Sequence, residues 1–552
     1  MPMAALKVVL GCALAVSFAM PAAATRPASG TIMADYVRAR AAAAEGQAEV
    51  AARAYGVVLA AAPANAMVAN RAYRQAIIAG DRPLAVKAVK ALEARGALLP
   101  DARLFLLVEA VDASDWTQAT ALVDEIEKDG IFAFAVPVLR AWIAYGSHRG
   151  DPLAVLADTR QAGGLAATYA NDHRVFLQLL DKDQQADAIA TVRAAVPFDR
   201  RLRLAAAAQL ARTDRTRALA LLQGNDAMFV RARALIEAGA PLPGAIDSAA
   251  RGISELFVRI AIDVNRERVA PLAISFARLA TFLAPDNAEA WMVTAGLLGA
   301  NGRGEAALTA LGRVPTDDPR ADAASALHVR LFVQQDKLAP ALAVALARAG
   351  QKEVVADDWA TVGGVYMEMK RPADAARAYA RALAAPPDVE EDKARWPLLL
   401  LQANALDQAG NWPAAKATLK TAAKLAPDQP AVLNYLGYAQ LERRENLAEA
   451  TALVERASQL KPDDSAITDS LGWAYYLRGD IPEAIATLER AVAGDPGQTT
   501  LNEHLGDAYW SAGRRIEARW AWRAALVFAD EGDIARLQGK IADGLTGRTA
   551  KR

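Results

Sequence analysis

The sequence predicts an all-α protein in which antiparallel helix pairs repeat along the chain and stack into a right-handed superhelical solenoid. Hydrophobic residues make up 53% of the 552 residues and aromatic residues only 6%, and alanine, the strongest helix former, dominates the hydrophobic share. Small residues recur at a fixed distance, since Gly472 and Gly506 are 34 residues apart. Prolines such as Pro496 then close each unit, because proline cannot continue a helix.

The same order of aromatic, small, alanine and proline positions occurs in several units that share one register. The small residue is expected where the first helix of a unit touches the second, because a side chain there would push the two helices apart. We expect all of these positions to be structural, and they are Trp359, Gly363, Tyr366, Ala375, Pro387, Gly437, Gly472, Ala484, Pro496, Gly506 and Ala518. This period and these positions resemble the tetratricopeptide repeat (TPR). The resemblance implies a helical-hairpin solenoid that binds other polypeptides.

Residues 1–24 have the features of a cleavable signal peptide. Lys7 precedes the apolar run from Val8 to Met20, and residues 22–24 are alanines that a signal peptidase accepts. The run is shorter than the ~20 apolar residues that a membrane span requires. Cys12 ends a stretch that resembles a lipoprotein processing box, which leaves a lipid anchor as the alternative. The short spacing between Lys7 and Cys12 favours cleavage and export to the periplasm.

The clarity of the repeat pattern divides the rest of the chain into segments. Two repeats are recognisable in 31–98, degenerate helical hairpins are expected in 99–250, and further TPR repeats in 251–350. Residues 356–535 are expected to form a C-terminal TPR array with a capping helix. Residues 546–552 are expected to be a frayed tail.

Composition and motifs argue against an enzyme. The 63 basic and 63 acidic residues balance to zero net charge, so the basic surface that binds nucleic acid is not expected. The only cysteine is Cys12, and the four histidines have no partners at metal-ligand spacing. Nucleophile-elbow and phosphate-loop motifs are also missing. We therefore expect no catalytic residues, no metal, no cofactor and no small-molecule substrate.

A protein or peptide partner is expected on the first helices of the four C-terminal units. Residues three before, one after and four after the small residue lie opposite the face that packs on the second helix. In these units they give an aromatic and acidic surface with amides, which favours a ligand that carries Lys or Arg. The predicted groove residues are Asn404, Asp407, Asn434, Tyr438, Asp469, Trp473, Tyr476, Glu503, Asp507 and Trp510. The alternative for Trp473 and Tyr476 is packing between adjacent units.

A closer resemblance covers residues 428–528. The run Asn434 to Tyr438, the run Asp469 to Trp473 and the run His504 to Trp510 occur in the order found in TPR proteins exported to the envelope of Gram-negative bacteria. Some members are outer-membrane lipoproteins that act as adaptors of periplasmic C-terminal-processing proteases. The resemblance implies a non-enzymatic adaptor with a possible outer-membrane association. The alternatives are an envelope assembly, secretion or polysaccharide factor, and a non-catalytic subunit of an enzyme complex. The oligomeric state is left open.

Export gives the first test. We expect protein purified from the envelope to begin near Thr25 and to carry no lipid, because residues 22–24 form a better processing site than Cys12. Intact-mass spectrometry checks both points. An acylated cysteine at the N-terminus would contradict the expectation and restore membrane anchoring.

Overall fold

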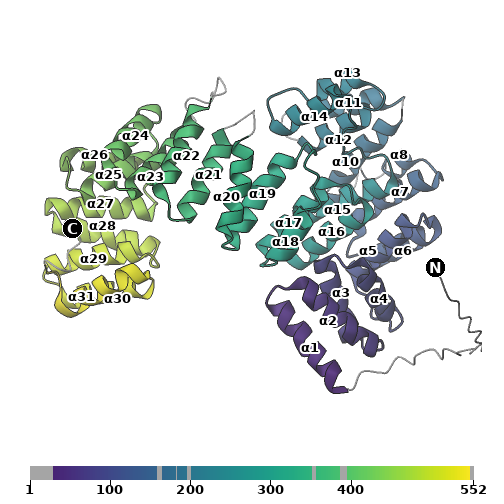
Figure 1. Cartoon of the computed structure of the whole chain (residues 1–552), viewed down its shortest axis with the longest axis horizontal. Coiled ribbons are helices and arrows are strands. Elements are labelled where there is room, and N and C mark those ends of the chain that lie inside the picture. Colours follow the sequence, from purple (N-terminus) through teal and green to yellow (C-terminus); the bar gives the residue numbers. More distant parts are fainter. Residues whose placement is uncertain are drawn as a thin grey trace, which may run out of the picture. The chain divides into compact units, whose positions relative to one another are not determined.

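A computed structural model describes residues 29–157, 159, 164–181, 183–194, 200–350, 356–385 and 395–546. Every regular element within these ranges is a helix, and successive helices pair into antiparallel hairpins (Figure 1). The predicted all-α, helical-hairpin solenoid is confirmed. The predicted signal peptide with Cys12, the position of Pro387 and residues 547–552 lie outside the described residues.

The chain divides into two compact units, Met1–Ala321 and Asp322–Arg552. The segment 251–350, expected to form one run of repeats, is therefore shared between the two units. The helices described in unit 1 are α1 (Ser29–Ala44), α2 (Ala48–Ala61), α3 (Ala66–Ala79), α4 (Arg82–Glu93), α5 (Pro100–Asp112), α6 (Trp116–Asp129), the 3₁₀ helix η1 (Ala133–Ala135), α7 (Val136–Ser147), α8 (Pro152–Val155), α10 (Gly164–Leu180), α11 (Gln185–Ala194), α12 (Arg200–Leu210), α13 (Arg215–Leu221), α14 (Ala227–Glu237), α15 (Ala249–Arg266), α16 (Ala270–Leu283), α17 (Ala288–Ala300) and α18 (Gly304–Leu311).

The hairpins of unit 1 begin and end at residues suited to helix termini. The Asn65 side chain accepts hydrogen bonds from the backbone N–H groups of Met67 and Val68 at the start of α3. Gly80 ends the same helix in the left-handed conformation, with φ of 78°, which costs glycine little. Asp81 then caps α4 by accepting from Leu84 N–H. These local signals fix the tight turn between two neighbouring helices.

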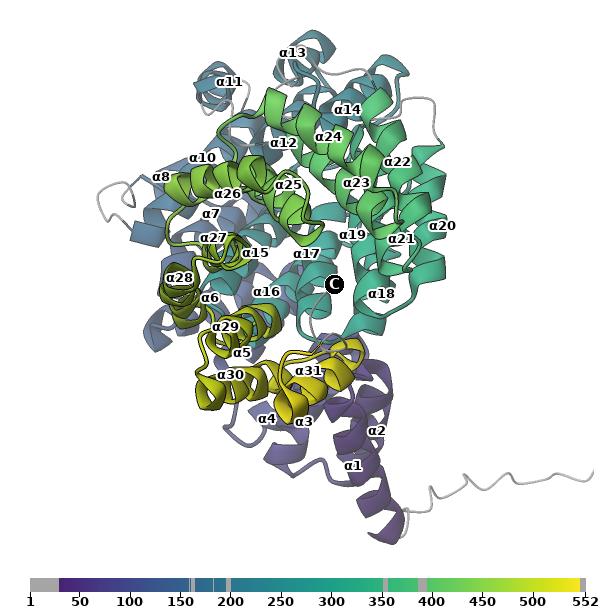
Figure 2. The same ribbon diagram turned by 90° about the vertical axis from the view of Figure 1, so that its left-hand side faces the viewer.

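Helix α16 lies inside unit 1 and is buried on all sides. Every residue from Ala273 to Leu283 is buried, including the polar Ser275, Arg278 and Thr281. It packs against α15 and α17 and also against the much earlier α3 and α5 (Figure 2). The buried Arg278 guanidinium donates from Nε to Ile77 O (3.1 Å) and from Nη2 to Ile78 O (2.9 Å), at the end of α3. The interior of this unit is therefore filled by its own chain.

A neutral histidine lies where α7, α10 and α15 meet. Trp142 Nε1 donates to His173 Nδ1 at 2.9 Å, and a Cβ at Gly252 would lie only 2.0 Å from the Trp142 ring. Glycine at 252 thus lets α15 close over the indole. Burial, with a smaller effect from the positive charge of Arg201, lowers the pKa of His173 to about 3. The interior therefore holds His173 in its uncharged form.

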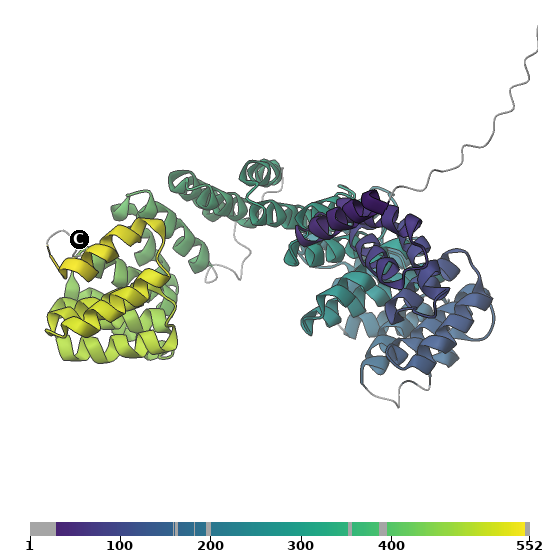
Figure 3. The same cartoon turned by 90° about the horizontal axis from the view of Figure 1, so that it is seen from below.

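Unit 2 is a row of helical hairpins followed by one last helix. Its helices are α19 (Ala321–Gln334), α20 (Leu338–Ala349), α21 (Ala356–Glu368), α22 (Pro372–Ala384), α23 (Trp396–Gln408), α24 (Trp412–Leu425), α25 (Pro430–Glu442), α26 (Leu447–Leu460), α27 (Ser465–Arg478), α28 (Ile481–Gly494), α29 (Thr499–Ser511), α30 (Arg515–Val527) and α31 (Glu531–Asp543). Helices α30 and α31 pack side by side at the C-terminal end of the row (Figure 3).

The predicted small residues lie at the closest points between paired helices of unit 2. A Cβ at Gly363 would lie 2.6 Å from the Tyr379 ring, and one at Gly472 would lie 2.7 Å from Leu488. The corresponding distances are 2.7 Å at Gly437, to Val454, and 2.4 Å at Gly506, to Trp522. The alanines predicted on the second helices are buried, and they are Ala375, Ala484 and Ala518. Trp359 and Tyr366 are partly buried, whereas Pro496 is exposed in the turn before α29.

His173 gives a stability prediction with a defined pH dependence. Its pKa is lowered on folding, so the unfolded chain binds the additional proton between pH 6.5 and about 3. The stability that His173 contributes is present above pH 6.5 and is lost as the pH falls below it, by up to about 1.4 kcal/mol per pH unit. His173→Gln removes this titration and keeps an oxygen that can accept from Trp142. We expect the stability gap between wild type and His173→Gln to shrink from pH 7 to pH 4 in urea unfolding, and parallel curves would contradict the assignment.

Candidate functional site

The ten predicted groove residues lie on the first helices of four consecutive hairpins of unit 2. Asn404 and Asp407 are on α23, and Asn434 and Tyr438 are on α25. The other six are Asp469, Trp473 and Tyr476 on α27 and Glu503, Asp507 and Trp510 on α29. Because each of these helices is held at its small residue against its own second helix, their inner faces line up next to one another.

A pocket of about 410 Å³ lies between the N-terminal halves of α25, α27 and α29. It brings together three predicted residues, Asn434, Tyr438 and Asp469. Its other lining residues are Tyr435, Ser465, Ala466, Ser470, Asp495, Gln498, Thr500 and Leu501. The lining contains two carboxylates and no basic side chain, so the pocket suits groups that donate hydrogen bonds or carry positive charge.

Two acceptors at this pocket have no partner among the residues that the structure describes. Asn434 Oδ1 is buried and has no hydrogen-bond partner, a state that costs free energy until a donor arrives. Asp495 is only partly buried and forms no ion pair with any residue that the structure describes. Burial, supported by the neighbouring charges of Glu442 and Asp469, raises the pKa of Tyr438, which therefore stays protonated as a donor.

Asp469 and Trp473 are buried between repeats, with exposed fractions of 3% and 5%, although Asp469 also contributes to the pocket lining. The Asp469 carboxylate accepts from His504 Nδ1 at 2.9 and 3.0 Å. The Trp473 ring lies between two others, 4.0 Å from His504 and 4.7 Å from Tyr476, and both pairs are stacked. The structure thus places Trp473 and Tyr476 in inter-repeat packing, the alternative that the sequence left open. Any part that they play in partner binding stays a prediction.

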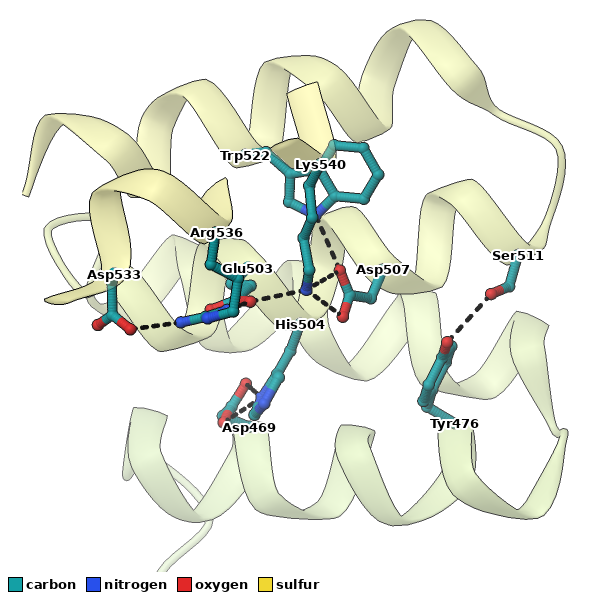
Figure 4. Close-up of polar contacts among 10 residues, drawn as sticks. All are labelled: Asp469, Tyr476, Glu503, His504, Asp507, Ser511, Trp522, Asp533, Arg536 and Lys540. Carbon is teal, nitrogen blue, oxygen red and sulfur yellow. Dashed lines mark hydrogen bonds and ion pairs between the residues drawn. The ribbon is translucent and has the colours of Figure 1, made fainter. Parts of the chain in front are cut away.

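Glu503 and Asp507 are covered by the chain's own last helix. Lys540 of α31 is fully buried, and its ammonium nitrogen lies 2.6 Å from Glu503 Oε1 and 2.7 Å from both Asp507 oxygens (Figure 4). Asp507 also accepts from Trp522 Nε1 at 2.9 Å. Burial lowers the pKa of Lys540, and the charge of Asp507 opposes this effect. A basic side chain from the same chain therefore already occupies the position expected for a ligand, and any part that Glu503 and Asp507 play in partner binding stays a prediction.

The remaining predicted residues are held by neighbours on the rim of the array. Asp407 forms an ion pair with Arg443, and the Tyr435 hydroxyl lies 3.3 Å from Asn404 Oδ1 and 3.5 Å from Asp407 Oδ2. Trp510 is half-buried under the Arg515 guanidinium, which lies 3.8 Å from the ring centre. Asn404, Asp407 and Trp510 do not line the pocket, whereas Tyr435 does.

Sequence reasoning missed the residues at the N-terminal end of the site. Ser465 and Thr500 lie in the first turns of α27 and α29, and Asp495 and Gln498 lie in the turn that leads into α29. The positions chosen around each small residue stop one turn short of these side chains. Extending the same helical face by one more turn would have reached Ser465, seven residues before Gly472.

Neither a metal centre nor a membrane span is found in the part of the chain that the structure describes. No three His, Cys, Asp or Glu side chains in these ranges are grouped so that they could hold a metal ion. None of the described helices has both the length and the apolar character needed to cross a bilayer.

Comparison with known proteins places TPR units at this site. The model of the tetratricopeptide-repeat family matches residues 400–465 and 470–534. A TPR protein of Thermus thermophilus has a solved structure that is 22% identical, with a TM-score of 0.29, covering 34% of this chain and 98% of its own. PilW, a type IV pilus biogenesis factor, is 20% identical, with a TM-score of 0.30, covering 35% and 88%. MamA of Desulfovibrio magneticus RS-1 is 18% identical, with a TM-score of 0.27, covering 31% and 94%.

No curated protein matches the chain. The solved structures say nothing about function at these identities and scores. The TPR fold itself is a protein-interaction scaffold, and the matched residues 400–465 and 470–534 include every residue that lines the pocket except Ala466 and Asp469.

The buried Lys540 gives a stability prediction. Lys540→Met leaves the buried Asp507 without its cation, while Glu503 keeps its ion pair with Arg536, so we expect it to destabilise unit 2 by about 3–5 kcal/mol in urea unfolding. Lys420→Met removes a lysine from an exposed pair with Glu449, and we expect it to change stability by less than about 1 kcal/mol. Adding Glu503→Gln and Asp507→Asn to Lys540→Met should recover much of the loss. Equal effects of the two single lysine variants would contradict the description of α31 as an ion-paired cap.

Proposed function

We propose that the C-terminal repeats of unit 2 bind a polypeptide segment with a basic residue in the pocket of α25, α27 and α29. The observation that carries this proposal is the unpaired, buried Asn434 Oδ1 in the same pocket as the carboxylate of Asp495. The amide oxygen can accept from a backbone N–H of the ligand, and the carboxylate can pair with Lys or Arg. Lys540 supports the same chemistry, because its ammonium group already pairs with the carboxylates of Glu503 and Asp507 on the inner face of α29.

We infer that the chain works as a non-enzymatic adaptor in the bacterial cell envelope, with a periplasmic processing protease as the partner. The features of residues 1–24 support export, and the resemblance of residues 428–528 supports the adaptor role. The pocket supplies a place for such a partner: its volume of about 410 Å³ accommodates several side chains of a bound segment.

Peptide binding tests the pocket directly. Fluorescence anisotropy is measured with a lysine-containing peptide and with the same peptide carrying glutamate instead of lysine. We expect preference for the basic peptide, and Asn434→Ala and Asp495→Asn should each weaken its binding about tenfold, roughly 1.4 kcal/mol. Asp463→Asn is the matched control, because Asp463 is exposed in the turn before α27 and does not line the pocket.

Equal affinity for the two peptides, or an equal loss in Asp463→Asn, would remove this pocket from the mechanism.

The adaptor role has its own test, a photo-crosslinking residue placed either at Thr500 in the pocket or at the exposed Ala486 on α28. We expect a processing protease to be captured in envelope fractions from position 500 and not from position 486. Capture of other proteins alone would overturn the protease assignment while leaving the peptide preference intact.

A further inference from the structure

Helix α30 is apolar on two opposite faces. Ala518, Trp522 and Ala525 are buried against the neighbouring helices. The other face carries Ile516, Trp520 and Val527, with exposed fractions of 68%, 67% and 74%. Spacings of four and seven residues align these three side chains along one line of the helix, which we term the α30 crest. Surface helices normally present polar residues on this side, so an exposed apolar crest marks a candidate contact surface.

The repeat fold does not require this crest. In α30 the crest residues lie two before, two after and nine after the buried Ala518. The same positions relative to the buried alanine hold Ala448, Ala452 and Gln459 in α26, and Pro482, Ala486 and Ala493 in α28. All six residues are exposed, and they are small or polar. The large side chains on α30 therefore belong to this helix alone among the last three second helices.

Three arginines that form no ion pair with the described residues lie next to the crest. Arg523 lies between Trp520 and Val527 on the same face, and Arg515 and Arg519 follow one flank. Arg515 donates to Trp510 O (2.9 Å) and Arg519 donates to Ile541 O (2.8 Å), both backbone carbonyls. None of the three forms an ion pair with a carboxylate of the described residues, whereas Arg514 is paired with Glu517. The surface around the crest is thus positively charged.

We propose that the α30 crest docks on the surface of a bilayer that contains anionic phospholipids. An interfacial helix of this kind carries tryptophan and aliphatic residues on one face with arginines beside them, and its apolar side chains enter the boundary of headgroups and acyl chains. The crest projects from a single helix, so a flat surface can reach it without a matching cavity. A symmetric contact between two copies would bring Arg523 close to its own counterpart, and this repulsion disfavours self-association.

Vesicle flotation tests the proposal on the chain from Thr25 onward, which keeps both described units and lacks the apolar leader. The vesicles contain phosphatidylglycerol mixed with phosphatidylethanolamine, or phosphatidylcholine alone. We expect binding to the anionic vesicles that falls with added salt and weak binding to the neutral ones. The triple variant Ile516→Ser, Trp520→Ser, Val527→Ser should lose at least tenfold in binding, and Arg523→Gln should lose about fivefold. Leu401→Ser, another exposed apolar residue of unit 2, is the control and should bind like wild type.

A site-specific probe shows which face touches lipid. The chain from Thr25 contains no cysteine, so Ala524→Cys beside the crest and Ala486→Cys on α28 can each be labelled with a polarity-sensitive fluorophore. Anionic vesicles should shift the emission to shorter wavelength at position 524 only.

An equal shift at both positions, or no binding to anionic vesicles at low salt, overturns the proposal. Concentration-dependent dimers that the triple variant abolishes would instead assign the crest to a second copy, and a probe shift produced only by added protein would assign it to a protein partner. The crest is independent of the peptide pocket, so the triple variant should still bind the basic peptide normally.

Discussion

The architecture of unit 2 depends on the missing side chains at the crossing points of its paired helices. At Gly472 and Gly506 a Cβ would lie 2.7 Å from Leu488 and 2.4 Å from Trp522, closer than packed carbon atoms approach. These contacts fix how each first helix lies on its second helix. The side chains of α25, α27 and α29 consequently reach one common pocket, although they come from three different repeats. The binding surface is thus a consequence of close packing on the opposite side of the same helices.

In each unit a helix from later in the sequence packs on earlier helices and places a buried cation against them. In unit 1, Arg278 of α16 binds two carbonyl oxygens at the end of α3. In unit 2, Lys540 of α31 binds Glu503 and Asp507. Because a buried charge without partners is costly, such contacts tolerate little displacement of the covering helix. The pocket between α25, α27 and α29 is not covered by α31.

The local repeat pattern was sufficient to predict the fold, because helix period, small residues and prolines all act within one hairpin. The candidate site could be predicted only in part. Helical spacing placed Asn434, Tyr438 and Asp469 on the inner face, and they do line one pocket. The covering of Asp507 could not be foreseen, because Lys540 lies 33 residues later and outside the repeat pattern. For the same reason the stack of His504 on Trp473 was missed, since it joins neighbouring repeats. Period and spacing describe one helix at a time, whereas the burial of a side chain depends on which other helices pack against it.

The inward position of α16 also determines when unit 1 can become stable during synthesis. The contacts of Arg278 with Ile77 and Ile78 span 201 and 200 residues, and Ser275 reaches Asp101 across 174. A nascent chain that stops before residue 270 leaves the inner sides of α3 and α5 exposed to water. High contact order of this kind delays folding until the distant segment has been made. The N-terminal hairpins therefore leave the ribosome without the helix that completes their packing, and unit 1 reaches its full stability only after α16 has been made.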